Sequence, residues 1–201
     1  MSSLIGFLSL VFAIGINFYL LLSKYIFKFQ KQRFNFLIRL SSLLTLLSFF
    51  SLMYAYMTSD FSNYNVFQNS HSNKPLIYKI SGTWGNHEGS MLLWLCILSI
   101  FSFFFSFTKN IEYNFQKLTL IIQSVLHILF GLFIVFSSNP FLVNSVIVNE
   151  GLGLNPILQD PGLAVHPPIL YAGYVGYSIV FSIAIAGLFQ NTDDEWLYVA
   201  K

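Results

Sequence analysis

Five runs of apolar residues constrain this chain more than any other feature of its sequence. They cover residues 4–22, 36–56, 90–107, 118–137 and 167–189. A helix that crosses a bilayer needs about 20 mostly apolar residues. Only 9% of the residues are charged, whereas soluble domains carry about 25%. The sequence therefore predicts an all-α membrane protein, with residues 1–201 forming one membrane domain of about five transmembrane helices.

Basic residues predict how these helices are oriented. One side of the predicted topology carries Lys24, Lys28, Lys31, Arg33, Arg39, Lys109, Lys117 and Lys201. The other side carries only Lys74 and Lys79. Because inner loops are enriched in Lys and Arg, we expect the N-terminus and two long loops, residues 57–89 and 138–166, to face outward. The first run lacks a basic leader, so we expect a retained helix and not a cleaved signal peptide.

Several classes of function find no support in the sequence. The net charge of +2 is too small to indicate a nucleic-acid partner. Cys96 is the only cysteine, which excludes an internal disulfide and a CxxC motif. Walker, HExxH and GxSxG motifs are absent from the sequence. Function should therefore concentrate in the two long loops.

The first long loop leads into the segment TWGNHEGSMLLW, residues 83–94. Trp84 and Trp94 suit interfacial anchors, the alternative being a flat platform for a planar ligand. Glu88 is either a carboxylate that complements a helix dipole or a functional group. His87 is either a ligand or a hydrogen-bonded structural residue.

The second long loop delivers His166 to the start of the last apolar run. Pro167 and Pro168 suit the first turn of a helix, where a missing N–H costs little. The spacing predicts His166 near the N-cap, with Tyr171 about one turn further along. An imidazole at this border is a natural axial ligand for a metal or a haem, with helix capping or packing as the alternative.

Two other histidines are weighed in the same way. His127 lies in the middle of an apolar run, where ionisable groups are functional candidates, yet no acid stands one turn away. We weigh a structural role for it against membership of a proton relay with His87 and Glu88. His71 lies among Ser and Asn and is predicted to be a solvated side chain.

Two segments resemble the CcmF-type cytochrome c haem lyase family and occur in the same order as in that family. They are TWGNHEGSMLLW, and LNPILQDPGLAVHPPILYAGYVGYS at residues 154–178. The segment DFSNYNVFQNS at residues 60–70 fits the same pattern. The resemblance covers nearly the whole chain and matches the N-terminal third of the family.

The resemblance implies a haem-handling function. His166 would be an outer-face axial ligand to haem, which would be shared with a partner chain. Enzymes of this family join the haem vinyl groups to the two thiols of a CxxCH motif in apocytochrome c. Implied partners are apocytochrome c, a haem-delivery protein and other lyase subunits that carry a tryptophan-rich loop. No catalytic residue is assigned, and the possible pocket-lining residues are Trp84, His87, Glu88, Trp94 and Tyr171.

The chain departs from the family because it stops before the tryptophan-rich loop and a second outer histidine. We expect one piece of a split lyase in the mitochondrial inner membrane, with the bacterial plasma membrane as the alternative. Two other functions stay open. One is a non-catalytic scaffold subunit, and the other is a proton-conducting subunit.

Overall fold

The fold is described from a computed structural model, which covers residues 1–22, 30–109, 111–146, 148–153 and 159–190. In these ranges the regular structure is helical, apart from one isolated bridge between Asn63 and Val143. Of the segment 154–178 that carries part of the family resemblance, residues 154–158 lie outside these ranges. The helices are α1 Ser2–Leu22, α2 Lys31–Met57, α3 Tyr64–Asn69, α4 Leu76–Gly82, α5 His87–Phe105, α6 Tyr113–Ser137 and α7 Pro161–Gln190.

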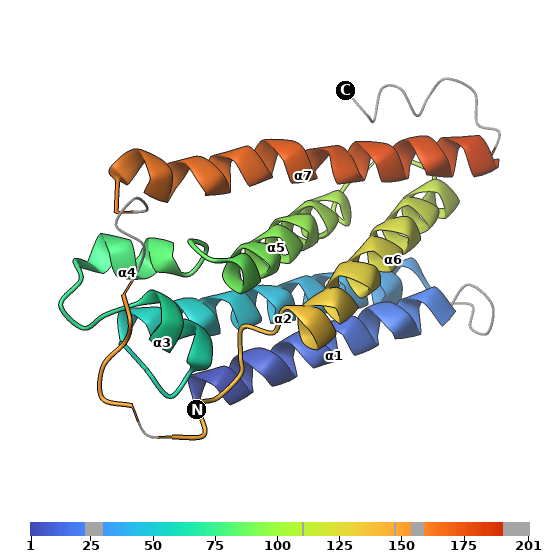
Figure 1. Cartoon of the computed structure of the whole chain (residues 1–201). Helices are drawn as coiled ribbons and strands as arrows, with labels where there is room; N and C mark the ends of the chain where they lie inside the picture. The colour runs from blue at the N-terminus through green and yellow to red at the C-terminus, as the bar shows by residue number, and fades with distance from the viewer. Residues whose placement is uncertain (23–29, 110, 147, 154–158, 191–201) are drawn as a thin grey trace.

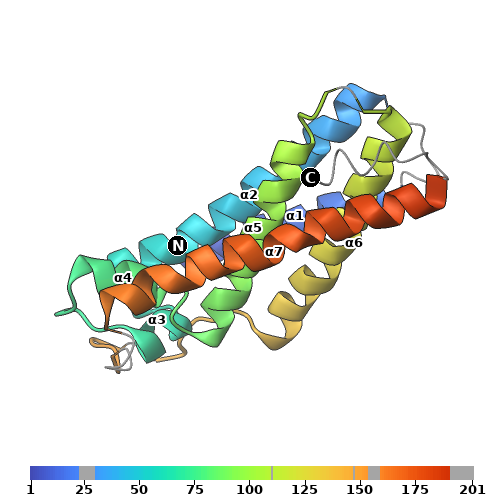
Figure 2. The same ribbon diagram turned by 90° about the horizontal axis from the view of Figure 1, so that it is seen from above.

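The five long helices are stacked in three tiers. In Figure 1, α7 lies above α5 and α6, which lie above α1 and α2. Seen from above in Figure 2, α7 crosses over α5 and α6, with which it packs. The short helices α3 and α4 lie together at one end of the bundle. We call this the loop end, because the described residues of both predicted outer loops gather there.

Each long helix is long and apolar enough to cross a membrane, which confirms the predicted fold class. Helices are expected here because lipid offers no hydrogen-bond partner, so backbone groups must pair within the segment. Helix α5 is the most enclosed, with 56% of its spanning window buried, and α7 is the least enclosed, with 22%. The side of the membrane on which the N-terminus lies stays a prediction.

The predicted start of the last helix is wrong by six residues. Helix α7 begins at Pro161 and not at Pro167. The Asp160 carboxylate accepts a hydrogen bond from the Gly162 amide at 2.8 Å, and the Asp160 carbonyl accepts one from the Ala164 amide at 2.9 Å. Pro161 suits the first helical position because no donor is needed there. His166 therefore lies inside the second turn of α7 and not at its N-cap.

The two predicted outer loops are joined into one cap over the loop end. The Tyr64 amide donates to the Leu142 carbonyl at 2.8 Å, and the Leu152 amide donates to the Phe67 carbonyl at 2.8 Å. These bonds pair backbone groups that would otherwise need water. The cap holds α3 against the chain that follows α6.

Asn63 connects this cap to the first helix. Its side chain is fully buried. Its Oδ1 caps α3 by accepting from the Val66 amide at 2.9 Å. Its Nδ2 donates to the Pro140 carbonyl at 2.9 Å and to Ser3 Oγ at 3.0 Å. One amide therefore ties together α1, α3 and the loop after α6.

Candidate functional site

His166 is exposed on α7 at the loop end. Within the described part of the chain no hydrogen bond engages its imidazole. Ile169 and Leu170 follow it on the same face of the helix, one turn further along, and both are more than half exposed. At Gly173, two turns from His166, an added Cβ would meet nothing within 4 Å. The imidazole thus stands above an open, apolar strip of α7.

Trp84 fixes the turn of α7 that carries His166. Its Nε1 donates to the Ala164 carbonyl at 2.9 Å. In a regular helix that carbonyl would accept from the residue four positions later, but Pro168 has no N–H to donate. Trp84 therefore pairs the carbonyl that Pro168 leaves without a helical partner. Its ring also stacks on Phe49, with centroids 6.5 Å apart.

The other two predicted pocket aromatics pack against the bundle. Trp94 is partly buried and stacks on Phe130, with ring centroids 3.7 Å apart. Tyr171 is partly buried against the same apolar cluster that Trp84 and Trp94 contact. This arrangement favours packing for Trp94 and Tyr171 and gives no support to a flat exposed platform.

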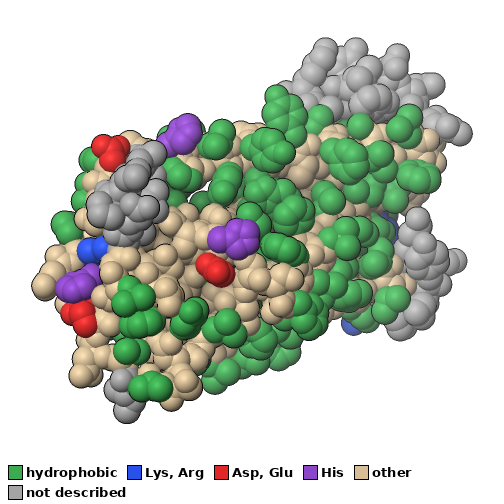
Figure 3. Space-filling view, viewed as in Figure 1, with side chains coloured by type: hydrophobic (Ala, Val, Ile, Leu, Met, Phe, Trp, Pro, Cys, Tyr) green, Lys and Arg blue, Asp and Glu red, His purple; other side chains and the backbone are tan. Residues whose placement is uncertain are grey.

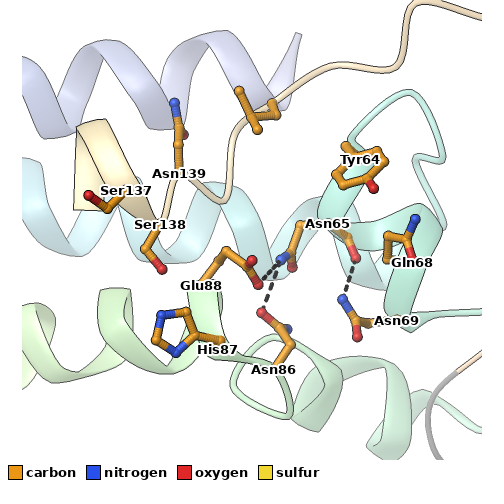
Figure 4. A pocket seen from close by; sticks show the side chains of 11 residues that line it. Tyr64, Asn65, Gln68, Asn69, Asn86, His87, Glu88, Ser137, Ser138 and Asn139 are labelled. Carbon is orange, nitrogen blue, oxygen red and sulfur yellow. Dashed lines mark hydrogen bonds between the residues drawn. The ribbon is translucent and has the colours of Figure 1, made fainter. Parts of the chain in front are cut away.

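His87 and Glu88 line a pocket of about 460 Å³ at the loop end, which we call the Glu88 pocket (Figure 4). Helix α3 forms one wall with Asn65 and Asn69, and residues 137–139 at the end of α6 form another. His87 is exposed, and its ring meets Phe133 edge-on at 6.5 Å between centroids. His166 does not line this pocket. The structure therefore places the predicted site residues in two different environments.

An amide network holds the pocket together, and its amide members, Asn65 and Asn86, were not predicted from the sequence. Asn86 caps α5, because its Oδ1 accepts from the Gly89 amide at 2.8 Å. Asn86 Nδ2 donates to the Tyr56 hydroxyl at 3.0 Å. Asn65 Nδ2 donates to Asn86 Oδ1 at 3.0 Å and to Glu88 Oε2 at 3.1 Å. Asn86 could have been found as an Asn directly before a helical run, whereas Asn65 is distant in sequence.

Ser138 brings an unpaired hydroxyl to the pocket. The residue is 2% exposed, and its Oγ has no hydrogen-bond partner among the described residues. Ser138 lines the same pocket as Glu88, on the opposite side from α3 in Figure 4. Buried polar atoms are normally paired, so this hydroxyl is available to a group that enters the pocket.

Acidic side chains and histidines gather around the cap. On the face shown in Figure 3, histidines and acidic side chains gather at the loop end. Two hydrogen bonds from Ser72 hold the pKa of exposed Glu150 at about 2. Burial lowers the pKa of Lys74 to about 8, and its Nζ donates to the Asn69 carbonyl at 3.0 Å. His71 lies 3.8 Å from Glu150 and is partly exposed, which supports a surface role for it.

His127 is buried between α1, α2 and α6 and has partners on both ring nitrogens. Asn17 Nδ2 lies 3.2 Å from Nδ1, and Thr45 Oγ1 lies 3.0 Å from Nε2. Thr45 Oγ1 in turn donates to the Ser41 carbonyl. Because an amide N–H can only donate, this network assigns the neutral tautomer protonated on Nε2. Its side-chain partners are an amide and a hydroxyl, which do not ionise, so the structural role is favoured over a proton relay.

Comparisons with known proteins agree with this architecture. The family model described as "Cytochrome C assembly protein" matches residues 84–199. The chain is 52% identical over 153 residues to the cytochrome c-type biogenesis protein CycK of Rhizobium meliloti (strain 1021), covering 76% of this chain and 23% of that protein. It is 43% identical over 151 residues to the cytochrome c-type biogenesis protein CcmF of Escherichia coli (strain K12), covering 73% and 23%.

A solved structure shares the fold. The structure named cytochrome c heme lyase CcmF aligns with a TM-score of 0.84 and 22% identity, covering 100% of this chain and 32% of that chain. The predicted resemblance to the N-terminal portion of this family is confirmed. The chain spans about a quarter of the length of the curated relatives it matches.

Proposed function

Because the chain belongs to the cytochrome c assembly protein family, we propose that it is a subunit of a cytochrome c haem lyase. In this proposal it presents haem at the loop end for covalent attachment to apocytochrome c. The observation that carries the proposal is the exposed imidazole of His166, which no hydrogen bond engages among the described residues. An uncommitted imidazole is a common axial ligand of haem iron.

The residues around His166 fit one face of a haem. Ile169 and Leu170 are exposed and apolar, and a porphyrin ring is largely apolar, so their burial against it would be favourable. Gly173 leaves open space on the same face. When bound, haem would supply the iron that His166 ligates and the vinyl groups that become attached to the cysteine thiols.

The contribution of this chain to the reaction is positional. Trp84, through its bond to the Ala164 carbonyl, holds the turn from which His166 projects. Fixing the imidazole would hold the vinyl groups near incoming thiols, and such orientation lowers the barrier without a new catalytic group. His166 would supply one ligand to the haem iron. A partner chain would complete the site, in our proposal a lyase subunit with a tryptophan-rich loop that works with a haem-delivery protein.

The chain is a membrane protein, and the compartment is part of the proposal. The relatives compared above are bacterial, which supports a bacterial plasma membrane. The mitochondrial inner membrane and the split form stay predictions. In either membrane we propose that the loop end faces outward.

Replacement of His166 tests the proposed function. The chain is purified with its partner chains, and His166→Ala is compared with His71→Ala, a loop-end histidine outside the strip. We expect His166→Ala to lose at least tenfold of the bound haem, measured by absorption per mole of complex, and His71→Ala to retain it. Unchanged haem absorption and unchanged holocytochrome yield in His166→Ala would remove His166 from this role.

A scaffold function is the second candidate, and the exposure of α7 favours it. Only 22% of its spanning window is buried in this chain, so α7 has a large face available to other helices. In this case a partner chain would bind haem alone. Purifying the partner without this chain separates the two functions, because full haem occupancy in the partner would support the scaffold.

A further inference from the structure

The lining of the Glu88 pocket, 11 residues in all, contains one carboxylate, that of Glu88, and neither Lys nor Arg. No ion pair to Glu88 is present in the described part of the chain. Glu88 lies in the first turn of α5, where the helix dipole offsets about half a unit charge. The remaining negative charge favours a cationic ligand.

The hydrogen-bonding groups indicate which cation fits. Asn65 Nδ2 donates to Glu88 Oε2 at 3.1 Å, whereas no described residue donates to Oε1, so Oε1 is the carboxylate oxygen with both lone pairs available. An arginine guanidinium pairs best with both oxygens of a carboxylate, whereas an ammonium acts as a compact point charge with three donors. The buried Ser138 hydroxyl, which has no partner, can accept a second ammonium hydrogen.

From these contacts we propose that the Glu88 pocket binds a primary ammonium group, carried by a lysine side chain of a polypeptide that docks at the loop end. The proposal rests on the proposed function, in which the chain meets a polypeptide substrate. The volume of about 460 Å³ lies within the range of ligand pockets. The amide side chains of Gln68, Asn69 and Asn139 also line the pocket, and such groups pair well with a peptide backbone.

The same chemistry could come from the ammonium of phosphatidylethanolamine. That headgroup also carries a phosphate, which would require cationic donors. Lys74 donates to the carbonyl of the wall residue Asn69, but it does not line the pocket. The lining thus favours a lysine side chain over a lipid headgroup.

Peptide binding to the 201-residue chain in phosphatidylcholine nanodiscs tests the proposal. The probes are acetylated and amidated pentapeptides, Gly-Ser-X-Ser-Gly, in which X is lysine, norleucine or arginine. Affinity is measured by thermophoresis at low salt. We expect the norleucine peptide, which keeps the apolar stem and lacks the ammonium, to bind at least tenfold more weakly than the lysine peptide. Arginine should bind several-fold more weakly. Equal binding of lysine and norleucine peptides, or no binding, would overturn the proposal.

Variants test whether the preference for the lysine peptide over the norleucine peptide arises in the Glu88 pocket. Glu88→Gln retains the size of the side chain and its ability to accept from Asn65, so the lysine-to-norleucine ratio should fall below about twofold. Ser138→Ala should reduce lysine affinity several-fold. Glu150→Gln removes a carboxylate outside the pocket and should leave the ratio unchanged. An unchanged ratio in Glu88→Gln would refute the assignment. The comparison of peptides on the unaltered chain remains decisive even if a variant fails to fold.

Two further comparisons distinguish a lysine side chain from a lipid headgroup, and the lysine pocket from the proposed haem role. Adding phosphatidylethanolamine to the nanodiscs should leave the lysine preference intact, and its loss would assign the pocket to lipid and overturn the proposal. Haem binding in the His166 experiment uses different residues. If lysine preference is absent while His166→Ala loses haem, only this inference fails. If lysine preference is present while His166→Ala keeps haem, the pocket stands and the haem role fails.

Discussion

Replacing Trp84 with Phe should leave the Ala164 carbonyl without a hydrogen-bond partner, because Pro168 has no N–H to donate to it. Ala164 is 4% exposed, and its carbonyl accepts from Trp84 Nε1 at 2.9 Å. Leaving a buried acceptor without a partner costs about 1–3 kcal/mol. Phe also loses part of the stacking area on Phe49, so the single substitution combines two effects. A double-mutant cycle separates them.

The second arm of the cycle is Pro168→Ala, which restores an N–H four residues after Ala164. In that background the carbonyl has a helical donor, so Trp84→Phe should cost about 1–2 kcal/mol less than in the unaltered chain. Pro167→Ala is the matched control, because it restores an N–H whose helical acceptor is not the Ala164 carbonyl. Unfolding is followed by circular dichroism in detergent as denaturant is added. An equal cost of Trp84→Phe in all three backgrounds would refute the role assigned to this bond.

Three further predictions address the cap, the core and one loop lysine. Asn86→Ala should destabilise the chain by about 1–2 kcal/mol because α5 loses its N-cap, and Asn86→Ser, which retains a capping oxygen, should recover part of that loss in the same unfolding assay. His127→Leu leaves the Asn17 amide and the Thr45 hydroxyl without their ring partners and should cost about 1–3 kcal/mol; a Tm unchanged in detergent would contradict the structural role. Burial lowers the pKa of Lys74 from 10.5 to about 8, so between these values the unfolded chain binds more protons and Tm should rise with pH. Lys74→Met should flatten that rise, and the same slope in both proteins would rule out Lys74 as its source.

The number of spanning helices could be predicted because lipid imposes one length and one composition on each of them. The ends of the helices were harder to predict, since they depend on individual hydrogen bonds. The pair Pro167 and Pro168 indicated a helix start, because prolines are normally tolerated only in the first turn. Here a tryptophan from the turn between α4 and α5 pairs one freed carbonyl, and Asp160 starts the helix earlier. Such compensation cannot be read from local sequence.

The candidate site was also only partly predictable from the sequence. Exposure of His166 followed from its place at the border of an apolar run. The surroundings of Glu88 did not follow, since its partner Asn65 comes from α3, and the Ser138 wall lies 50 residues further along the chain. The pairing of the two loops brings these residues together. Backbone pairing between loops leaves no periodic pattern in the sequence.

The buried amide of Asn63 has a consequence for biosynthesis. It spans 60 residues back to Ser3 and 77 residues forward to Pro140. While the ribosome has delivered only the first two membrane helices, this side chain lacks its later acceptor and the cap has no second loop to close upon. Domains gain their long-range contacts only when the necessary chain has emerged. The cap, where we propose that partner chains dock, is therefore completed only after α6 and the chain that follows it have emerged. A chain terminated before that point would reach the membrane with its cap open.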